Sequence, residues 1–153
     1  MSLPKLKVSG INVVQQDNNK VVRLVGLSEF ALFKRYLMTN GPTALVEPIL
    51  TERKMIAERS GWKGPIFLRV FRHAANWNAF GITDPWSYMD SSGQFTKLTQ
   101  FIQFCEDRGF YVDLTAGDYQ MCFPGIGADG ERGQQNHINK TLAAMVPTSS
   151  IFQ

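Results

Sequence analysis

One short stretch of the chain, residues 67–81, carries several side chains of the kind that recognise sugars. His73 and Trp77 are four residues apart, so they share a face if this segment winds helically. Asn76 and Asn78 stand on either side of Trp77. A tryptophan ring can cover the apolar C–H face of a sugar while amide and imidazole groups bond its hydroxyls. The stretch predicts a polar-aromatic groove for an oligosaccharide, although each side chain could instead only hold its own loop in place.

Arg69 is a second candidate, because it stands inside the apolar run 66–71. Taking a guanidinium out of water costs several kcal/mol unless a carboxylate pairs with it. Asp113, embedded in the apolar run 110–115, is one available partner. Two interpretations follow: the pair fixes the register of two strands, or Arg69 orients a carboxylate within a site.

Two further carboxylates stand where apolar runs end. Glu29 follows the first run and Asp118 follows the third, with Tyr119 beside it. A pair of carboxylates can act as acid and base in glycoside hydrolysis. Carboxylates are also ordinary loop formers through Asx turns. We place Glu29, Asp118 and Tyr119 among the expected substrate-binding residues, together with His73, Asn76 and Trp77.

The elements that must position these residues begin with three short runs, at residues 21–27, 66–71 and 110–115. Each run is β-branched, aliphatic or aromatic at both odd and even positions, which is typical of parallel strands covered by helices. Two β-rich runs flank residues 17–19, whose types suit a tight turn. An N-terminal β-hairpin leading into the first strand is therefore expected.

Helical spacing of apolar residues predicts three helices, at residues 48–60, 94–108 and 132–146. We expect Pro48 at the first position of the first helix and Ser91 or Ser92 as the cap of the second. Gly61 and Gly109 should end these two helices. Alternating strands and helices predict an α/β fold with right-handed crossovers.

The predicted strands start about 44 residues apart, whereas a bare barrel unit needs only about 30. The surplus lies after each strand, in long loops rich in aromatic residues and glycine, while the helix-to-strand joins are short. Elaborated loops at the carboxyl ends of parallel strands are where α/β proteins bind their ligands. The crowded end of residues 67–81 lies at that edge.

Composition limits the remaining choices. With 153 residues of which 44% are hydrophobic, the chain can bury one core, so residues 1–153 are expected to form a single domain. The net charge of +3 comes without a run of like charges, and this argues against a nucleic-acid partner.

The two cysteines lack CxxC spacing, and no glycine-rich phosphate loop is present, so no metal or cofactor is expected. No apolar stretch approaches about 18 residues, so no membrane partner is expected; localisation stays open.

Three pieces of the chain resemble the cellulase-like enzymes of glycoside hydrolase clan A, especially family five. "VVRLVGLSEF" is similar to the first strand of that family, "FLRVF" to its second strand with an inward arginine, and "FTKLTQFIQFCEDRGFYVDLTAGD" to its helix, turn and third strand. The likeness spans roughly residues 8–146. Where the family often has a histidine at the end of the third strand, this chain reads "LTAG".

The resemblance implies an eight-stranded (β/α)8 TIM barrel, of which this chain holds the hairpin and the first three βα units. It implies a retaining mechanism on a β-linked polysaccharide, with both catalytic glutamates expected beyond residue 153. Arg69 would hydrogen-bond the nucleophile and orient it. The alternative is a non-catalytic barrel module that binds glycans or builds a larger assembly, such as a viral particle. Either way the rest of the barrel, or another chain, must cover the sheet edge, so the 153-residue chain alone should not be a well-behaved monomer.

Overall fold

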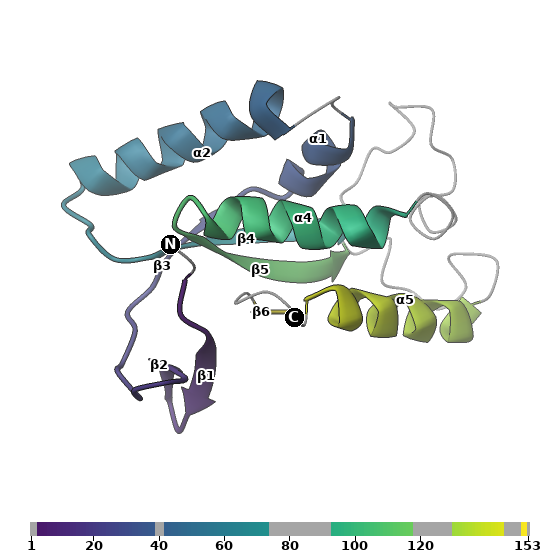
Figure 1. Ribbon diagram of the computed structural model, residues 1–153, viewed down its shortest axis with the longest axis horizontal. Helices are drawn as coiled ribbons and strands as arrows, with labels where there is room; N and C mark the ends of the chain where they lie inside the picture. Colours follow the sequence, from purple (N-terminus) through teal and green to yellow (C-terminus); the bar gives the residue numbers. More distant parts are fainter. Residues whose placement is uncertain (1–2, 39–41, 74–92, 118–129, 146–150, 153) are drawn as a thin grey trace.

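The computed structural model describes residues 3–38, 42–73, 93–117, 130–145 and 151–152, and these form one α/β unit (Figure 1). The strands are β1 (Leu6–Ser9), β2 (Asn12–Gln15), β3 (Val25–Ser28), β4 (Ile66–His73), β5 (Phe110–Gly117) and β6 (Ile151–Phe152). The helices are α1 (Leu32–Met38), α2 (Pro42–Arg59), α4 (Gln94–Glu106) and α5 (Gly130–Met145).

The main sheet has the order β3-β4-β5-β6, and every neighbouring pair is parallel. Strand order thus follows chain order, with Leu27 opposite Leu68 and Leu68 opposite Val112. The three expected strands and their parallel pairing are confirmed, and β6 adds a fourth that the sequence analysis did not assign. Four strands establish an α/β fold with a parallel sheet, but they do not establish an incomplete eight-stranded barrel.

The N-terminal hairpin turns earlier than expected. β1 and β2 pair antiparallel from Leu6–Gln15 to Ser9–Asn12, so their turn lies at residues 10–11. The chain also reverses at residues 17–19 as predicted, with a bridge between Val14 and Val21. Because residues 20–22 are taken up by this antiparallel pairing, β3 starts only at Val25 and not at residue 21.

The helices depart from the predictions mainly at their starts. α2 begins at Pro42, which takes the first position that we assigned to Pro48, and Pro48 lies inside the helix. The N-cap of α4 is Gly93, without a side-chain cap, and Ser91 and Ser92 lie outside the described residues. α1 falls in a segment expected to be a loop. The predicted ends hold: a glycine with left-handed φ follows α2 (Gly61, 81°) and α4 (Gly109, 87°).

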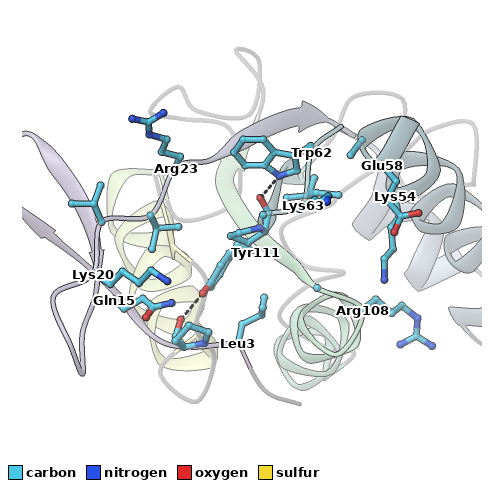
Figure 2. Close-up of a pocket in the computed structure, with 18 residues that line it drawn as sticks. Leu3, Gln15, Lys20, Arg23, Lys54, Glu58, Trp62, Lys63, Arg108 and Tyr111 are labelled. Carbon is cyan, nitrogen blue, oxygen red and sulfur yellow. Dashed lines mark hydrogen bonds between the residues drawn. The ribbon is translucent and has the colours of Figure 1, made fainter. Parts of the chain in front are cut away.

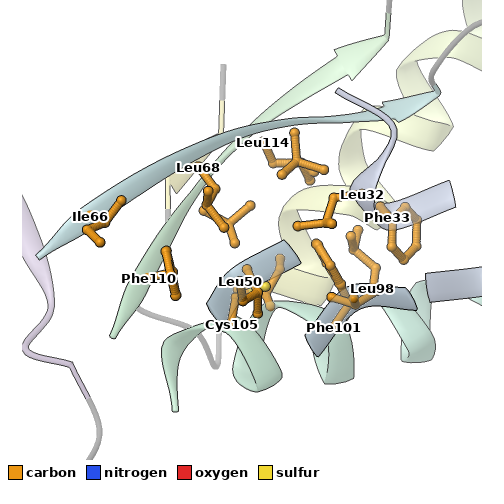
Figure 3. Close-up of a cluster of buried hydrophobic side chains, with 14 of the residues drawn as sticks. Leu32, Phe33, Leu50, Ile66, Leu68, Leu98, Phe101, Cys105, Phe110 and Leu114 are labelled. Atoms are coloured by element: carbon orange, nitrogen blue, oxygen red, sulfur yellow. The ribbon is translucent and has the colours of Figure 1, made fainter. Parts of the chain in front are cut away.

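The core lies on one face of the sheet. Leu68 and Val70 of β4 and Val112 and Leu114 of β5 are fully buried there. Against them pack side chains from all four helices, shown in part in Figure 3: Leu32, Phe33, Leu37, Val46, Leu50, Ala57, Leu98, Phe101, Ile102, Cys105 and Met145. Burying this much apolar surface drives the fold, at about 25 cal/mol per Å². Alternate residues of the same strands point to the opposite face, and that face holds the candidate site.

Candidate functional site on the helix-free face of the sheet

We call the second side of the sheet the helix-free face, because its residues do not belong to the core cluster under the helices. Its described side chains on β4 and β5 are Phe67, Arg69, Phe71, Tyr111, Asp113 and Thr115. Strand alternation explains the set, since these residues alternate with the buried Leu68, Val70, Val112 and Leu114. The face therefore presents three aromatic rings, one cation, one carboxylate and two hydroxyls on two neighbouring strands.

The amino half of this face is covered. The rings of Phe67 and Tyr111 lie 5.3 Å apart, and the side chains are only 7% and 1% exposed. The Tyr111 hydroxyl donates a hydrogen bond of 2.6 Å to the backbone carbonyl of Pro4, which ties the N-terminal segment down. Burial raises the pKa of Tyr111 to about 12, so the phenol stays a donor. Within the described residues, the more exposed side chains of this face therefore lie in its carboxyl half.

Arg69 lies in that open carboxyl half, and its side chain is exposed. Its Nε donates to the Thr115 hydroxyl at 3.3 Å, and its guanidinium lies 5.4 Å from the centre of the Phe71 ring. Arg69 and Asp113 are opposite each other in the strand register, yet among the described residues they form no ion pair. The interpretation that an Arg69–Asp113 ion pair fixes the register is therefore not supported.

Asp113 has an unmet hydrogen-bonding capacity. Its Oδ1 is buried and has no hydrogen-bond partner among the described residues. Burial raises the pKa of Asp113, and the positive charge of Arg69 opposes that rise. A buried acceptor without a donor costs about 1–3 kcal/mol. A hydroxyl group brought by a ligand would satisfy this oxygen.

Phe30 belongs to the site and was not predicted. Its ring stacks on Phe71 with centroids 4.9 Å apart, and the side chain is 48% exposed. The Phe71 N–H donates to the Phe30 carbonyl at 3.1 Å, which fixes the two backbones side by side. The signal was present in the sequence, because Phe30 follows β3 at even spacing from Ser28, as Phe71 follows Arg69. We name Phe30, Phe71 and Arg69 the rim row.

The predicted binding residues differ in where the structure places them. The carboxylate of Glu29 forms an ion pair with Arg53 of α2, so it is held by a helix and not by Arg69. His73 is the last residue of β4, with its Cα opposite Gly117 of β5, at the carboxyl edge where it was expected. Asn76, Trp77, Asp118 and Tyr119 lie outside the described residues, and their roles stay predictions.

The described residues hold neither a cluster of metal-ligand side chains nor a membrane-spanning helix. Three or more His, Cys, Asp or Glu side chains do not cluster as metal ligands anywhere in this part of the chain. None of its helices is both long and apolar enough to cross a membrane. Comparison of the chain with protein-family models, with curated proteins and with solved structures gives no match.

Proposed function

We propose that the carboxyl half of the helix-free face binds a β-linked carbohydrate, as the N-terminal part of a glycoside hydrolase-like barrel. The observation that carries the proposal is the rim row of Phe30, Phe71 and Arg69 beside Asp113, whose Oδ1 has no hydrogen-bond partner among the described residues. Stacked, part-exposed aromatic rings offer a flat apolar surface next to charged hydrogen-bonding groups. A sugar ring presents the same combination, with an apolar C–H face and a belt of hydroxyls.

The arrangement of the sheet supports the barrel part of the proposal. All its strands are parallel and follow chain order, and the core side chains of α1, α2, α4 and α5 lie on one face only. A doubly wound sheet instead carries helices on both faces. In a barrel the helices form the outer ring, and the site lies at the carboxyl ends of the strands. The rim row lies at that end of β3 and β4.

Each residue would have a separate part in binding. Phe30 and Phe71 would stack on the sugar, and Arg69 would donate to a hydroxyl or orient a carboxylate. Asp113 would accept a hydroxyl hydrogen through Oδ1. Retaining hydrolysis needs two carboxyl groups about 5–5.5 Å apart, and Asp113 is the one carboxylate that the described strands place on this face. The proposal therefore assigns the catalytic glutamates to chain beyond residue 153.

A specific observation favours a second candidate, a glycan-binding or structural module without catalysis. Glu29, another carboxylate predicted for the site, is engaged by Arg53. If the glutamates are absent, the rim row would still bind sugar. In a larger assembly such as a viral particle, neighbouring chains would cover β3 and β6, the two ends of the sheet.

Isothermal titration of the 153-residue chain with cello-, xylo-, manno- and chito-hexaose tests the proposal. We expect one of these ligands to bind, and Phe30→Ala to weaken that binding about tenfold, the effect of losing one stacking contact of about 1.4 kcal/mol. Leu45→Ala is the matched control, because Leu45 is 45% exposed on α2, away from this face. Absence of binding to all four, or equal losses in both variants, would refute the carbohydrate face. If a ligand binds, an assay for the release of reducing ends by a longer form of the protein would distinguish a hydrolase from a binding module.

A further inference from the structure

A large cleft lies at the opposite end of the strands from the rim row. β3 and β4 pair only from Val25 and Ile66 onward. Before that point the backbone of Val22 donates to Val13 of the hairpin at 2.9 Å, so the segment leading to β3 turns away from the segment leading to β4. The two segments separate around a cleft of about 1040 Å³, shown in Figure 2.

Positive charge gathers around this cleft, which we call the basic cleft. It is lined by five cations and one acidic residue: Lys20, Arg23, Lys54, Lys63, Arg108 and Glu58. These residues come from separate segments, as Figure 2 shows. Lys20 and Arg23 lie between β2 and β3, Lys54 and Glu58 lie in α2, Lys63 follows α2, and Arg108 follows α4. The basic residues are scattered along the sequence, and the fold brings them together.

Some of these cations are already neutralised and others are not. Arg108 pairs with Glu47 at 2.7 Å and lies 3.5 Å from the centre of the Phe104 ring. Lys20, Arg23 and Lys63 are exposed and form no ion pair with any described residue. Three uncompensated cations in one concave site create a positive potential that attracts an anionic ligand.

The surface between the cations is apolar. Val21 is 53% exposed, and Val22, Pro65 and Trp62 continue the lining. The Trp62 ring is not free for stacking: its N–H donates to the Pro65 carbonyl at 3.1 Å, and a Cβ at Gly64 would come within 2.8 Å of the ring. Tyr111 is buried, with its hydroxyl bonded to Pro4.

We propose that the basic cleft binds an acidic peptide segment of a partner protein, one that carries aliphatic side chains between its carboxylates. Carboxylates would meet Lys20, Arg23 and Lys63, and the aliphatic side chains would cover Val21 and its neighbours. Single-stranded nucleic acid fits less well, because its bases stack on exposed aromatic side chains. The two aromatic residues of the cleft, Trp62 and Tyr111, are already packed and hydrogen-bonded within the protein. This site is independent of the proposed carbohydrate face, since the two lie at opposite ends of β4.

Fluorescence polarisation with the full 153-residue chain tests the inference. The probe is a fluorescein-labelled ten-residue peptide of glutamate and leucine, compared with a ten-residue polyglutamate and a twelve-nucleotide single-stranded DNA. We expect the mixed peptide to bind most tightly. Lys20→Glu/Lys63→Glu should weaken its binding at least about tenfold, as expected when two charge contacts turn repulsive.

Lys7→Glu/Lys97→Glu is the matched control, because it changes net charge equally at exposed positions outside the cleft. Val21→Ser tests the apolar contribution and should weaken the mixed peptide more than polyglutamate. Equal weakening by the two double variants would overturn the proposal, as would tighter binding of DNA. A dimer in sedimentation that only the cleft variant abolishes would assign the cleft to a second copy of the chain and would also overturn it. Circular dichroism of each variant verifies that the fold is retained.

Discussion

The ion pair between Glu29 and Arg53 separates a structural role of Glu29 from a role in ligand binding. Glu29 follows β3 directly, where a binding carboxylate was expected, but its Oε1 accepts from Nε of Arg53 on α2. The Glu29 side chain is 17% exposed and that of Arg53 is 29% exposed. The same arginine also reaches Glu52 at 3.4 Å, and Glu52 is 63% exposed. One cation therefore has a shielded partner and an exposed partner.

The expected coupling energy between Glu29 and Arg53 follows from this difference in burial. A hydrogen bond to a charged group contributes about 1.5–3 kcal/mol when buried, and an exposed ion pair about 0.2–1 kcal/mol. Partial burial places the Glu29–Arg53 coupling between these ranges, at about 1–1.5 kcal/mol. For a chain of this size 1 kcal/mol corresponds to about 2–4 °C in Tm. Glu29→Gln should therefore lower Tm by about 2–6 °C.

A double-mutant cycle of Glu29→Gln with Arg53→Met, read by urea and thermal unfolding, measures the coupling directly. The parallel cycle of Glu52→Gln with Arg53→Met is the control and should give less than about 0.5 kcal/mol. Carbohydrate affinity of Glu29→Gln should match that of the unmodified chain. Equal couplings in the two cycles would refute the reasoning from burial. A loss of sugar affinity without a change in Tm would show that Glu29 contributes to ligand binding and not to stability.

Three further predictions concern single positions. Burial raises the pKa of Asp113 above its unfolded value, so the folded state holds its proton more tightly and stability falls as pH rises above about 4; Asp113→Asn should remove this fall in urea unfolding measured from pH 4 to 7, and an unchanged pH profile would contradict it. Tyr111→Phe deletes the bond to Pro4 and should cost about 1 kcal/mol, with faster amide exchange in residues 3–9; unchanged exchange would show that the bond does not hold the segment. Gly64→Ala brings a Cβ within 2.8 Å of Trp62 and should destabilise by about 1–3 kcal/mol, whereas Gly26→Ala, whose Cβ would lie 4.0 Å from Phe67, separates this steric effect from that of losing a glycine.

β4 and β5 were predictable because apolar residues at both odd and even positions leave a clear pattern. Residues 66–71 and 110–115 are apolar at nearly every position, and both became central strands. The start of β3 was not predictable by the same argument. Val21 and Val22 have equally β-prone side chains, but the hairpin recruits them through the bridge to Val14, and that competition depends on tertiary context.

The missed helix α1 and the misplaced start of α2 have local causes. α1 has only seven residues, too short to show a sustained helical period. A proline suits the first turn of a helix, and the chain offers two, Pro42 and Pro48, of which the earlier one begins α2. The aromatic content of the segment around α1 suggested a ligand loop, but Leu32 and Phe33 are buried in the core. Aromatic and aliphatic residues after a strand thus do not by themselves distinguish a site from packing.

Within the candidate site, alternation along β4 and β5 was enough to place Arg69 and Asp113 on one face, but not to say which half of that face is open. Tyr111 and Asp113 are two residues apart on β5. Tyr111 is bonded to Pro4, whereas Oδ1 of Asp113 has no hydrogen-bond partner in the described part of the chain. The difference comes from the N-terminal segment, more than 100 residues away in the chain, whose path depends on where the hairpin turns. Because that segment closes the amino half, a carbohydrate chain on this face would have to run over the rim row and across the ends of β3, β4 and β5. Trp77 and Tyr119 follow β4 and β5 in the sequence but lie outside the described residues, so their predicted part in sugar binding makes them the next two residues to substitute.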